Sequence, residues 1–398
     1  MDVNLTIKPS TKMNLENENN VIRIPEVYRH NLNFQVGKNI FLKHKDGNIK
    51  NFQIDFAYKE DLINPWAAYI TQQNFNNIKT LKDNYITIGC DPEFFLIDTR
   101  TYTISNAANH FVFNSDVGND GLLAEFRPKY SDNENDVTNN IKNLIIKARN
   151  KLNTTRHGKH IMLYGISSFN KYAGGYHIHF GLPKSLLVYN QFNEQLLRQI
   201  ISILDYYIGI MAVLPEGIDD VQRRTDKGIP YGKPGAFNYN RTTLEYRTPG
   251  AYLLRHPSLT NGIMAIGYLV MNDIVKNLID GDLLVQDDIQ QTKKNLKQHY
   301  NIPSKKNIYN AICSSNLIEA FNYLGDIKYN LTKMYLYKNK KQNIMEYLNI
   351  IENNIKFFGN IETNWRNFYD KEQQNKMVLY KTPFETNNYF TRSNILEN

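Results

Sequence analysis

Three short segments of this 398-residue chain carry polar or charged residues in pairs spaced two positions apart. The pairs are Asp91 with Glu93, His177 with His179, and Glu245 with Arg247. Apolar residues flank each pair, which indicates β-strands. Alternate residues of a strand point to the same face of a sheet, so each pair is expected to project onto one face. The pattern predicts a sheet with carboxylates, imidazoles and a guanidinium gathered on one side.

A fourth segment places Glu125 and Arg127 at the same spacing, which adds another acid to the set. Hard divalent cations such as Mg²⁺ prefer carboxylate oxygens, and Mg²⁺ commonly takes one or two protein carboxylates together with substrate phosphates. Two histidines at this spacing are a frequent metal or phosphate site. We therefore expect divalent metal bound by the acids Asp91, Glu93, Glu125 and Glu245, with phosphate close by and the histidines at the metal or the phosphate.

A basic, glycine-rich segment runs from Arg223 and Arg224 through Lys233 towards Arg241 and Arg247. Arginine forks match phosphate oxygens with two parallel hydrogen bonds. The common phosphate-binding patterns GxxxxGK[ST] and GxGxxG do not occur in the sequence. These arginines are therefore candidate phosphate contacts in a fold other than the P-loop or Rossmann type.

Each motif alone also has an ordinary structural interpretation. Asp91-Pro92-Glu93 fits a turn, the two histidines fit a surface strand, and the basic segment fits a solvated loop. Only the combination of the segments favours a single site.

The order of predicted elements indicates an α+β fold, with an antiparallel-rich sheet and helices on one face. Between residues 84 and 255, strands are expected at 85–97, 102–105, 110–114, 121–127, 161–167, 175–182 and 242–248, helices at 134–152 and 192–213, and a loop at 215–240. One apolar stripe supports the first helix: Val137, Ile141, Leu144, Ile145, Ala148 and Leu152. After residue 255 the chain is expected to be mostly helical, including a helix at 306–324.

Three regions follow from this organisation. Residues 1–83 form an N-terminal arm and a small β extension, with a hairpin of Asn39–His44 and Ile49–Phe56. Residues 84–255 form the core that carries every motif. Residues 256–398 form a helical C-terminal region.

Charge and cysteine content limit the partners and the compartment. The chain has 47 basic and 39 acidic residues, a net charge of +8, but the lysines are scattered, so nucleic-acid binding is not favoured. Two cysteines exclude a disulfide framework and fit a reducing, cytoplasmic compartment. The N-terminus shows no signal peptide, and polar residues interrupt the longest apolar stretches, so we expect a soluble protein without a membrane span.

Five motifs in order give a resemblance to a known family. They are DPEFF (91–95), DGLLAEFRP (120–128), GGYHIHFG (174–181), YGKPGAF (231–237) and LEYRTP (244–249). In this order they resemble the phage-encoded type 2 carboxylate–amine ligases, or amidoligases, of the glutamine synthetase and γ-glutamylcysteine synthetase superfamily. The resemblance covers residues 84–255 and implies a sheet of the glutamine synthetase catalytic-domain type.

The resemblance also implies a reaction and residue roles. ATP would phosphorylate a carboxylate, and an amine would attack the acyl phosphate to form an amide or isopeptide bond, with Mg²⁺ or Mn²⁺ as cofactor. The metal ligands would be Asp91, Glu93, Glu125, His177 and Glu245. The nucleotide contacts would be His179, Arg223, Arg224, Lys233 and Arg247, and the catalytic residues Arg241, Glu245 and Arg247. Two positions depart from the family pattern: Tyr176 interrupts the usual GGHxH run, and Asn238 stands near an expected arginine.

Two other functions remain open at this point. A virion or assembly protein could keep a ligase fold without activity, because the two flanking regions have no family match. A metal-dependent hydrolase could use His177 and His179 on Zn²⁺, although catalytic zinc sites are commonly richer in histidine than this acidic set.

For a ligase, the substrates would be small-molecule or peptide carboxylates and amines, and the general base would be Asp116 or Asp120. The protein could be a homo-oligomer or a phage structural component, and its expected location is the host cytoplasm.

Overall fold

The computed structural model describes residues 7–9, 21–26, 29, 35–43, 49–57, 68–70, 86–182, 190–239, 243–279, 283–285 and 288–370. These residues belong to two compact units. The first comprises 1–85, 183–196 and 272–299, and the second 86–182, 197–271 and 300–398. All the site residues predicted from the sequence fall within the range of the second unit.

The first unit contains a five-stranded sheet. Its strands are β1 (Ile7–Pro9), β2 (Val21–Ile24), β3 (Asn39–Lys43), β4 (Ile49–Phe56) and β5 (Ala68–Ile70), in the order β1-β5-β2-β4-β3. The pairing of β3 with β4 is antiparallel, which confirms the two strands of the predicted hairpin. The turn between them lies outside the described residues. The N-terminal arm contributes β1 and β2 to this sheet, and Ile22 and Ile24 of β2 are fully buried.

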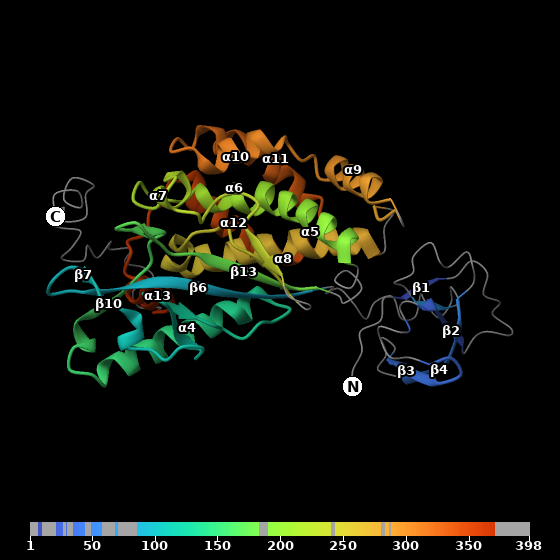
Figure 1. Cartoon of the computed structure of the whole chain (residues 1–398), viewed down its shortest axis with the longest axis horizontal. Helices are drawn as coiled ribbons and strands as arrows, with labels where there is room; N and C mark the ends of the chain where they lie inside the picture. The colour runs from blue at the N-terminus through green and yellow to red at the C-terminus, as the bar shows by residue number, and fades with distance from the viewer. Residues whose placement is uncertain are drawn as a thin grey trace. The chain divides into compact units, whose positions relative to one another are not determined.

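The second unit is built on an eight-stranded sheet in which every pairing is antiparallel. Its main path runs β14-β15-β13-β6-β9-β8, and β7 and β10 also pair with β6. The strands are β6 (Thr87–Asp98), β7 (Thr103–Ile104), β8 (Val117–Asp120), β9 (Leu123–Phe126), β10 (Ile161–Tyr164), β13 (Tyr176–Gly181), β14 (Phe237–Tyr239) and β15 (Thr243–Tyr246). The twelve-residue strand β6 is therefore central, with β13 beside it in Figure 1.

Helices make up most of the remaining described chain. They are α4 (Glu134–Asn153), α5 (Asn190–Leu204), α6 (Ile210–Val213), α7 (Gln222–Thr225), α8 (Pro257–Ile279), α9 (Ile289–His299), α10 (Lys305–Cys313), α11 (Ile318–Thr332), α12 (Tyr337–Glu352) and α13 (Ile361–Tyr369). A π-helical segment, Asp205–Gly209, joins α5 to α6. Short 3-10 helices occur at Ala107–Asn109, Gly158–His160 and Ala251–Arg255, and a small hairpin pairs β11 (Ser168–Phe169) with β12 (Tyr172–Ala173).

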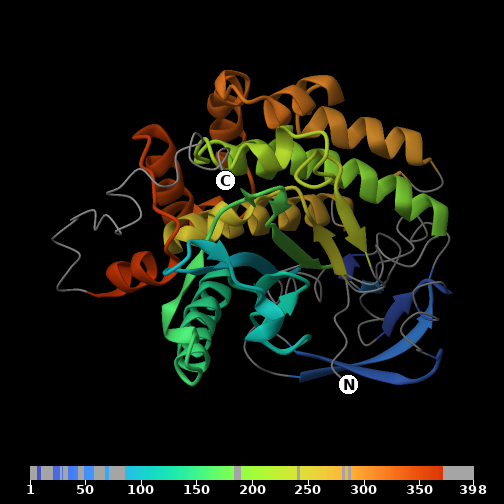
Figure 2. The same cartoon turned by 60° about the vertical axis from the view of Figure 1, so that its left-hand side comes forward.

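The side chains of β13 alternate between the helices and the opposite face. Ile178 and Phe180 are fully buried, and a Cβ on Gly267 of α8 would lie 3.5 Å from the Phe180 ring. In Figures 1 and 2, α8 runs beside β13, with α6 and then α10 and α11 further out. His177 and His179 alternate with Ile178 and Phe180, so they face away from α8.

Polar contacts link the helices to one another. Thr138 of α4 lies 3.2 Å from Asn261 of α8, and Lys340 of α12 donates to Glu134 at the start of α4 over 2.5 Å. The predicted apolar stripe of α4 is confirmed, because all six of its residues are buried.

The α+β class, the antiparallel-rich sheet and the helical C-terminal region are confirmed, and three local predictions are wrong. Residues 110–114 are a turn, and the strand that follows, β8, begins at Val117. The predicted helix at 306–324 is two helices, because the chain breaks between Cys313 and Ile318. The predicted loop at 215–240 contains α7 and β14.

One helical stretch among the described residues, Glu194–Val213, is long and apolar enough by composition to cross a membrane. In its most apolar window 89% of the residues are buried inside the protein, which is the arrangement of a core helix. The stretch contains Asp205, which is 4% exposed and hydrogen-bonded.

Candidate active site

The centre of the site is a cross-strand pair on the two middle strands of the sheet. His177 on β13 lies directly opposite Asp91 on β6, and the His177 Nδ1 atom is 3.2 Å from Asp91 Oδ1. The second histidine approaches the same carboxylate, with His179 Nε2 3.0 Å from Asp91 Oδ2. The predicted projection of both histidines and Asp91 onto one face is therefore observed.

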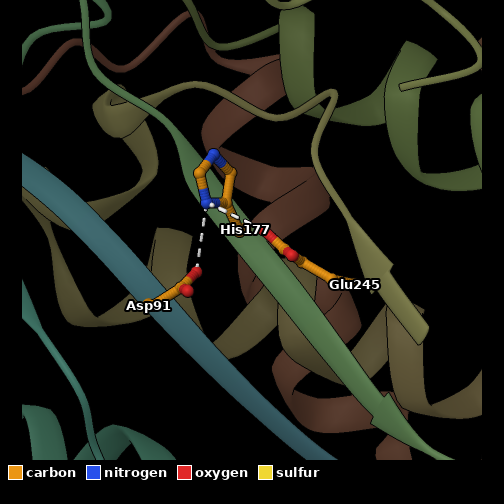
Figure 3. A group of neighbouring side chains, drawn as sticks. All are labelled: Asp91, His177 and Glu245. Carbon is orange, nitrogen blue, oxygen red and sulfur yellow. Dashed lines mark ion pairs between the residues drawn. The ribbon is translucent and has the colours of Figure 1, made fainter. Parts of the chain in front are cut away.

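Glu245 joins this pair from the neighbouring strand. It lies opposite His179 in the pairing of β13 with β15, and its Oε1 atom is 3.4 Å from His177 Nδ1. One ligand atom each from Asp91, His177 and Glu245 forms a set whose members all lie within 4.8 Å of one another. Figure 3 shows the two carboxylates on either side of the imidazole. We call these three residues the Asp–His–Glu group.

Asp91 and the two histidines shift one another's pKa values. Burial raises the pKa of Asp91, but contacts with His177 and His179 outweigh burial and bring the pKa of Asp91 down to about 2. Burial lowers the pKa of His179, and the adjacent Asp91 carboxylate more than compensates, so the pKa of His179 is raised. Asp91 is therefore ionised across the physiological pH range.

Two further carboxyls extend the acidic row. Glu93 on β6 lies directly opposite Glu125 on β9, and like charges placed in this way repel. Burial, followed by the nearby Asp91 charge, raises the pKa of Glu125 to about 8, although Arg127 forms an ion pair with it. Burial also raises the pKa of Glu93. Such a pair is stabilised by a bound cation or by a shared proton.

The glycine before β13 makes room for His177. A Cβ on Gly175 would lie 2.3 Å from His177 Nε2 and 2.8 Å from its Cδ2 atom. The backbone N–H of Gly175 also donates to Glu93 Oε2 over 2.6 Å. The glycine at position 175 is therefore explained by close packing of the imidazole over the backbone.

A cavity of about 340 Å³ opens beside the Asp–His–Glu group. Its wall combines acids, bases and aromatic rings: Glu93, Asp120, Lys171, Tyr172, His177, Arg223, Tyr231 and Arg247. Arg247 is also paired with Glu245, with its Nε atom 3.0 Å from Glu245 Oε1. The cavity can therefore present both positive and negative groups to a ligand next to the candidate metal ligands.

The two arginines of α7 have different surroundings, although both are 2% exposed. Arg223 lines the cavity and donates to the carbonyls of Thr248 over 2.5 Å and of Arg247 over 3.0 Å. Burial lowers its pKa to about 10. Arg224 instead donates to Glu216 over 2.6 Å and to the carbonyls of Ile312 and Ser314.

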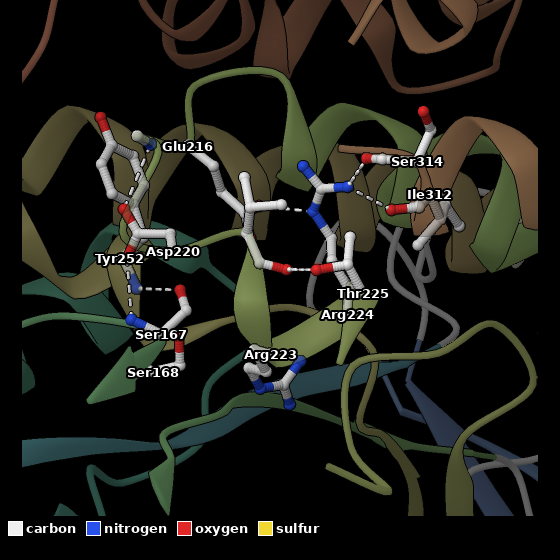
Figure 4. A network of polar contacts seen from close by, with 12 residues as sticks. Ser167, Ser168, Glu216, Asp220, Arg223, Arg224, Thr225, Tyr252, Ile312 and Ser314 are labelled. Atoms are coloured by element: carbon white, nitrogen blue, oxygen red, sulfur yellow. Dashed lines mark hydrogen bonds and ion pairs between the residues drawn. The ribbon is translucent and has the colours of Figure 1, made fainter. Parts of the chain in front are cut away.

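Figure 4 shows Arg224 with its buried polar contacts and, in the same region, Ser167 and Ser168. Ser168 of β11 donates to the Asp219 carbonyl over 3.0 Å. Asp220, which has no exposed surface, accepts from the Ser167 N–H over 2.8 Å and from Arg255 over 3.2 Å. The Gly174 N–H in turn donates to the Ser167 carbonyl over 3.0 Å. The network therefore fixes the backbone that leads into β13.

The structure brings most of the predicted site residues together. Asp91, Glu93, Glu125, His177, His179, Glu245 and Arg247 share one face of the sheet, and Arg223 reaches the adjoining cavity. It does not bring Arg224 there, and the Lys233 ammonium is directed to the carbonyls of Asp226 and Ile229 in its own loop. Arg241 lies outside the described residues.

Among the charged and aromatic residues of the cavity wall, three had no role predicted from the sequence: Lys171, Tyr172 and Tyr231. Lys171 and Tyr172 lie in the β11–β12 hairpin, whose turn residues Asn170 and Lys171 both have positive φ, 48° and 68°. An asparagine in a two-residue connection is a known hairpin signal, but the strands here are only two residues long. Tyr231 belongs to the basic loop and is 48% exposed.

The donor set of the Asp–His–Glu group fits a divalent cation. Neighbouring ligands of an octahedral ion bound at about 2.1 Å lie about 3 Å apart, and the two contacts of His177 Nδ1 are 3.2 and 3.4 Å. Carboxylates suit Mg²⁺ and Mn²⁺, whereas imidazole also suits Zn²⁺. Three protein ligands are also the number in catalytic zinc sites, so the donors alone do not separate a ligase from a hydrolase.

Fold and site together define an α+β protein with a candidate metal group on an antiparallel sheet beside a charged cavity. The family model described as phage phiEco32-like COOH.NH2 ligase-type 2 matches residues 88–366, more than two thirds of the chain. The chain belongs to this family of carboxylate–amine ligases. The match runs across the predicted boundary at residue 255, and the division into three regions stays a prediction.

Several solved structures show a distant likeness. A glutamine synthetase of Plasmodium falciparum matches with a TM-score of 0.39 and 11% identity, over 80% of this chain and 81% of its own. Ligand-free GmaS matches with a TM-score of 0.33 and 13% identity, over 68% of this chain and 79% of its own. A bifunctional glutathione synthetase from Pasteurella multocida matches with a TM-score of 0.31 and 8% identity, over 68% of this chain and 52% of its own. No curated protein matches the sequence.

Proposed function

We propose that this protein is an ATP-dependent carboxylate–amine ligase that forms an amide or isopeptide bond through an acyl phosphate. One observation carries the proposal beyond family membership: the Asp–His–Glu group, with donor atoms within 4.8 Å of one another, adjoins a cavity lined by Arg223 and Arg247. Transfer of a phosphoryl group to a carboxylate brings two anions together. Cations placed between them lower that barrier.

The metal-binding role falls to Asp91, His177 and Glu245, with Glu93 and Glu125 available for a further ion. Mg²⁺ or Mn²⁺ bound there would neutralise phosphate charge during the transfer. Asp91 is suited to this role because its pKa of about 2 keeps it anionic. The opposed carboxyls of Glu93 and Glu125 would lose their mutual repulsion on binding a cation.

The remaining cavity residues bind and orient the substrates. Arg247 and Arg223 place guanidinium groups where a carboxylate or phosphate would approach the Asp–His–Glu group, and we assign to them the binding of the reacting anion. His179 and Arg241 complete the predicted nucleotide and catalytic set. The contacts of Arg224 and Lys233 with their own surroundings support structural roles for these two residues.

Attack by an amine requires that it first lose a proton, and a cavity carboxylate can accept it. Asp120 lines the cavity and is our candidate for this base. Asp116, the other candidate from the sequence, is half-exposed and paired with Lys147 over 2.7 Å. That surface ion pair favours Asp120.

Hydroxylamine trapping tests the proposal without knowledge of the natural amine. Hydroxylamine attacks an acyl phosphate to give a stable hydroxamate, with release of phosphate. The enzyme is incubated with ATP, Mg²⁺, hydroxylamine and a panel of amino acids and peptides that carry carboxylates. We expect hydroxamate and ADP in equal amounts with at least one substrate, and neither with Asp91→Asn.

Release of ADP without hydroxamate, or no nucleotide turnover with any carboxylate, would contradict the acyl-phosphate route. Absence of turnover, together with incorporation of the protein into particles, would favour the assembly-protein alternative. Tightly bound Zn²⁺ with ATP-independent hydrolysis would favour the hydrolase. Small-molecule or peptide substrates, a homo-oligomeric state and a location in the cytoplasm of a phage-infected cell belong to the same proposal.

A further inference from the structure

The helical turn between α5 and α6 has an unusual geometry. The segment Asp205–Gly209 is π-helical, and the Ile210 N–H donates to the Asp205 carbonyl at its start. π-Helices are rare and occur mostly as single turns within α-helices, frequently at functional sites. The Asp205 side chain is 4% exposed, so its carboxylate depends on hydrogen bonds from within the protein.

The Asp205 carboxylate is contacted by two separate segments. Its Oδ1 atom accepts from the Tyr246 hydroxyl over 2.9 Å, and the Thr248 hydroxyl lies 3.3 Å from the same atom. Its Oδ2 atom accepts from the Gly235 N–H over 2.8 Å. Gly235 has a φ of 85°, a conformation that suits glycine. Asp205 therefore joins the end of β15 to the loop that leads into β14.

Gly209, at the other end of the π-helical turn, makes room for the same tyrosine. A Cβ at this position would lie 2.7 Å from the Tyr246 hydroxyl oxygen and 3.6 Å from Thr248 Cγ2. The Tyr246 side chain is fully buried. One end of the turn therefore supplies the hydrogen-bond acceptor for Tyr246, and the other end supplies the space for its hydroxyl.

The pairing of β13 with β15 holds Glu245 but stops short of Arg247. β15 ends at Tyr246, and Glu245 lies within the pairing, opposite His179. Arg247 follows the strand, and its side chain lines the active-site cavity. The position of its guanidinium group therefore depends on the contacts that hold the chain after β15.

Asp205 contacts the residues on both sides of Arg247. Tyr246 precedes Arg247 and Thr248 follows it, and the hydroxyls of both approach the Asp205 carboxylate. The Arg247 N–H donates over 3.0 Å to the carbonyl of Ala236, in the loop that Asp205 also contacts. Alternate residues point to opposite sides, so the contacts with Asp205 leave the Arg247 side chain directed to the cavity.

We propose that Asp205 is a positioning residue, which orients the Arg247 guanidinium towards the anionic substrate through Tyr246 and Thr248. The inference rests on the proposed function, which assigns anion binding to Arg247. Asp205 itself makes no contact with the substrate in this scheme. Because the strand pairing holds Glu245, the metal ligands should keep their places when the contacts of Asp205 are lost.

Two conservative substitutions test the proposal. Tyr246→Phe removes one hydroxyl and keeps the buried ring, and Thr248→Val removes the other at nearly constant size. The probe is the fluorescence of trinitrophenyl-ATP in saturating Mg²⁺ at pH 8, where Asp205 is mostly ionised, since burial raises its pKa to about 7. We expect the affinity for the probe to fall by about tenfold in Tyr246→Phe and by about threefold in Thr248→Val.

Metal binding separates a positioning role from a general loss of structure. Mn²⁺ affinity, followed by electron paramagnetic resonance, should be unchanged in Tyr246→Phe. Tyr347→Phe is the matched control, because the Tyr347 hydroxyl is also buried and donates to the Met211 carbonyl of α6 over 2.9 Å. It should leave both affinities unchanged. Equal losses of Mn²⁺ and probe affinity in Tyr246→Phe would overturn the assignment to Arg247.

A double substitution shows whether the effect passes through Arg247. Adding Tyr246→Phe to Arg247→Gln should weaken the probe no further. Full additivity of the two, or unchanged probe affinity in Tyr246→Phe alone, would overturn the positioning role and leave the ligase proposal intact. Unchanged affinity in Arg247→Gln, or no binding by the unmodified protein, would instead contradict the anion-binding role of Arg247, and the positioning role with it.

Discussion

His177 Nδ1 lies 3.2 Å from Oδ1 of Asp91, its cross-strand partner on β6. The same nitrogen is 3.4 Å from Glu245 on the strand at the other side. One imidazole therefore stands between two carboxylates from different strands, held by the register of three antiparallel strands. A shift of one residue in either pairing would move a member of the group to the opposite face of the sheet.

The first prediction concerns Gly175→Ala. The added methyl group would lie 2.3 Å from His177 Nε2, closer than real Cβ contacts, so the imidazole must move. We expect Mn²⁺ affinity to fall by at least about tenfold, the cost of misplacing one ligand or its support. Isothermal titration calorimetry measures the affinity, and circular dichroism shows that the fold persists.

Gly325→Ala is the matched control, because nothing lies within 4 Å of the added Cβ in α11. It should leave Mn²⁺ affinity unchanged and stabilise the helix by up to about 1 kcal/mol. An equal effect of both substitutions on metal binding would show that the close approach at Gly175 does not position His177.

The site was largely predictable because its residues follow the two-residue period of strands. Asp91, Glu93, His177 and His179 could be placed on one face from spacing alone, and the order of the motifs supplied the family. The pairing of the strands could not be read in this way, since register depends on contacts between segments far apart in the sequence.

One residue that was placed wrongly from the sequence and one that was missed have a shared physical origin. Arg224 was expected near phosphate because it lies in a basic segment of the sequence. In the structure it belongs to the short helix α7, and its side chain donates to Glu216 and to backbone carbonyl groups. Lys171 belongs to a hairpin whose strands are two residues long, too short for an alternating pattern. In both cases tertiary contacts outweigh the local sequence.

The second prediction contrasts two arginines from the basic motifs. Arg224→Gln should destabilise the protein by about 3–5 kcal/mol, because it leaves Glu216 without its buried charged partner. Its effect on nucleotide affinity in the remaining folded protein should be small. Urea unfolding measures stability, and fluorescence of a nucleotide analogue measures affinity.

Arg247→Gln should show the opposite result. Its side chain is 35% exposed and lines the active-site cavity, so we expect a stability change below about 1 kcal/mol. Affinity for the anionic substrate or nucleotide should fall by about tenfold or more, as expected for one lost charge-assisted contact. Loss of nucleotide affinity in Arg224→Gln but not in Arg247→Gln would reverse the assignment.

The third prediction concerns acid stability and His256. This ring stacks on Phe357 with centroids 4.0 Å apart, and burial lowers the pKa of His256 from 6.5 to about 3. Below pH 6.5 the unfolded chain takes up a proton at this residue that the folded protein excludes, so stability falls as pH falls. Between pH 7 and 5 the residue accounts for about 2 kcal/mol of that loss.

Replacement by Phe, which keeps the ring stacking, should remove this component. Urea unfolding at pH 7, 6 and 5 should therefore give a shallower decline for His256→Phe than for the unmodified protein. Parallel declines in the two proteins would mean that His256 can be protonated in the folded state.

The central claim is that Asp91, His177 and Glu245 form a divalent cation site. Its most direct test is a Mn²⁺ titration followed by electron paramagnetic resonance, on the unmodified protein, Glu245→Gln and the surface control Asp116→Asn. We predict saturable binding that is at least about tenfold weaker in Glu245→Gln and unchanged in Asp116→Asn. Equal Mn²⁺ binding by all three proteins, or none by the unmodified protein, would contradict it.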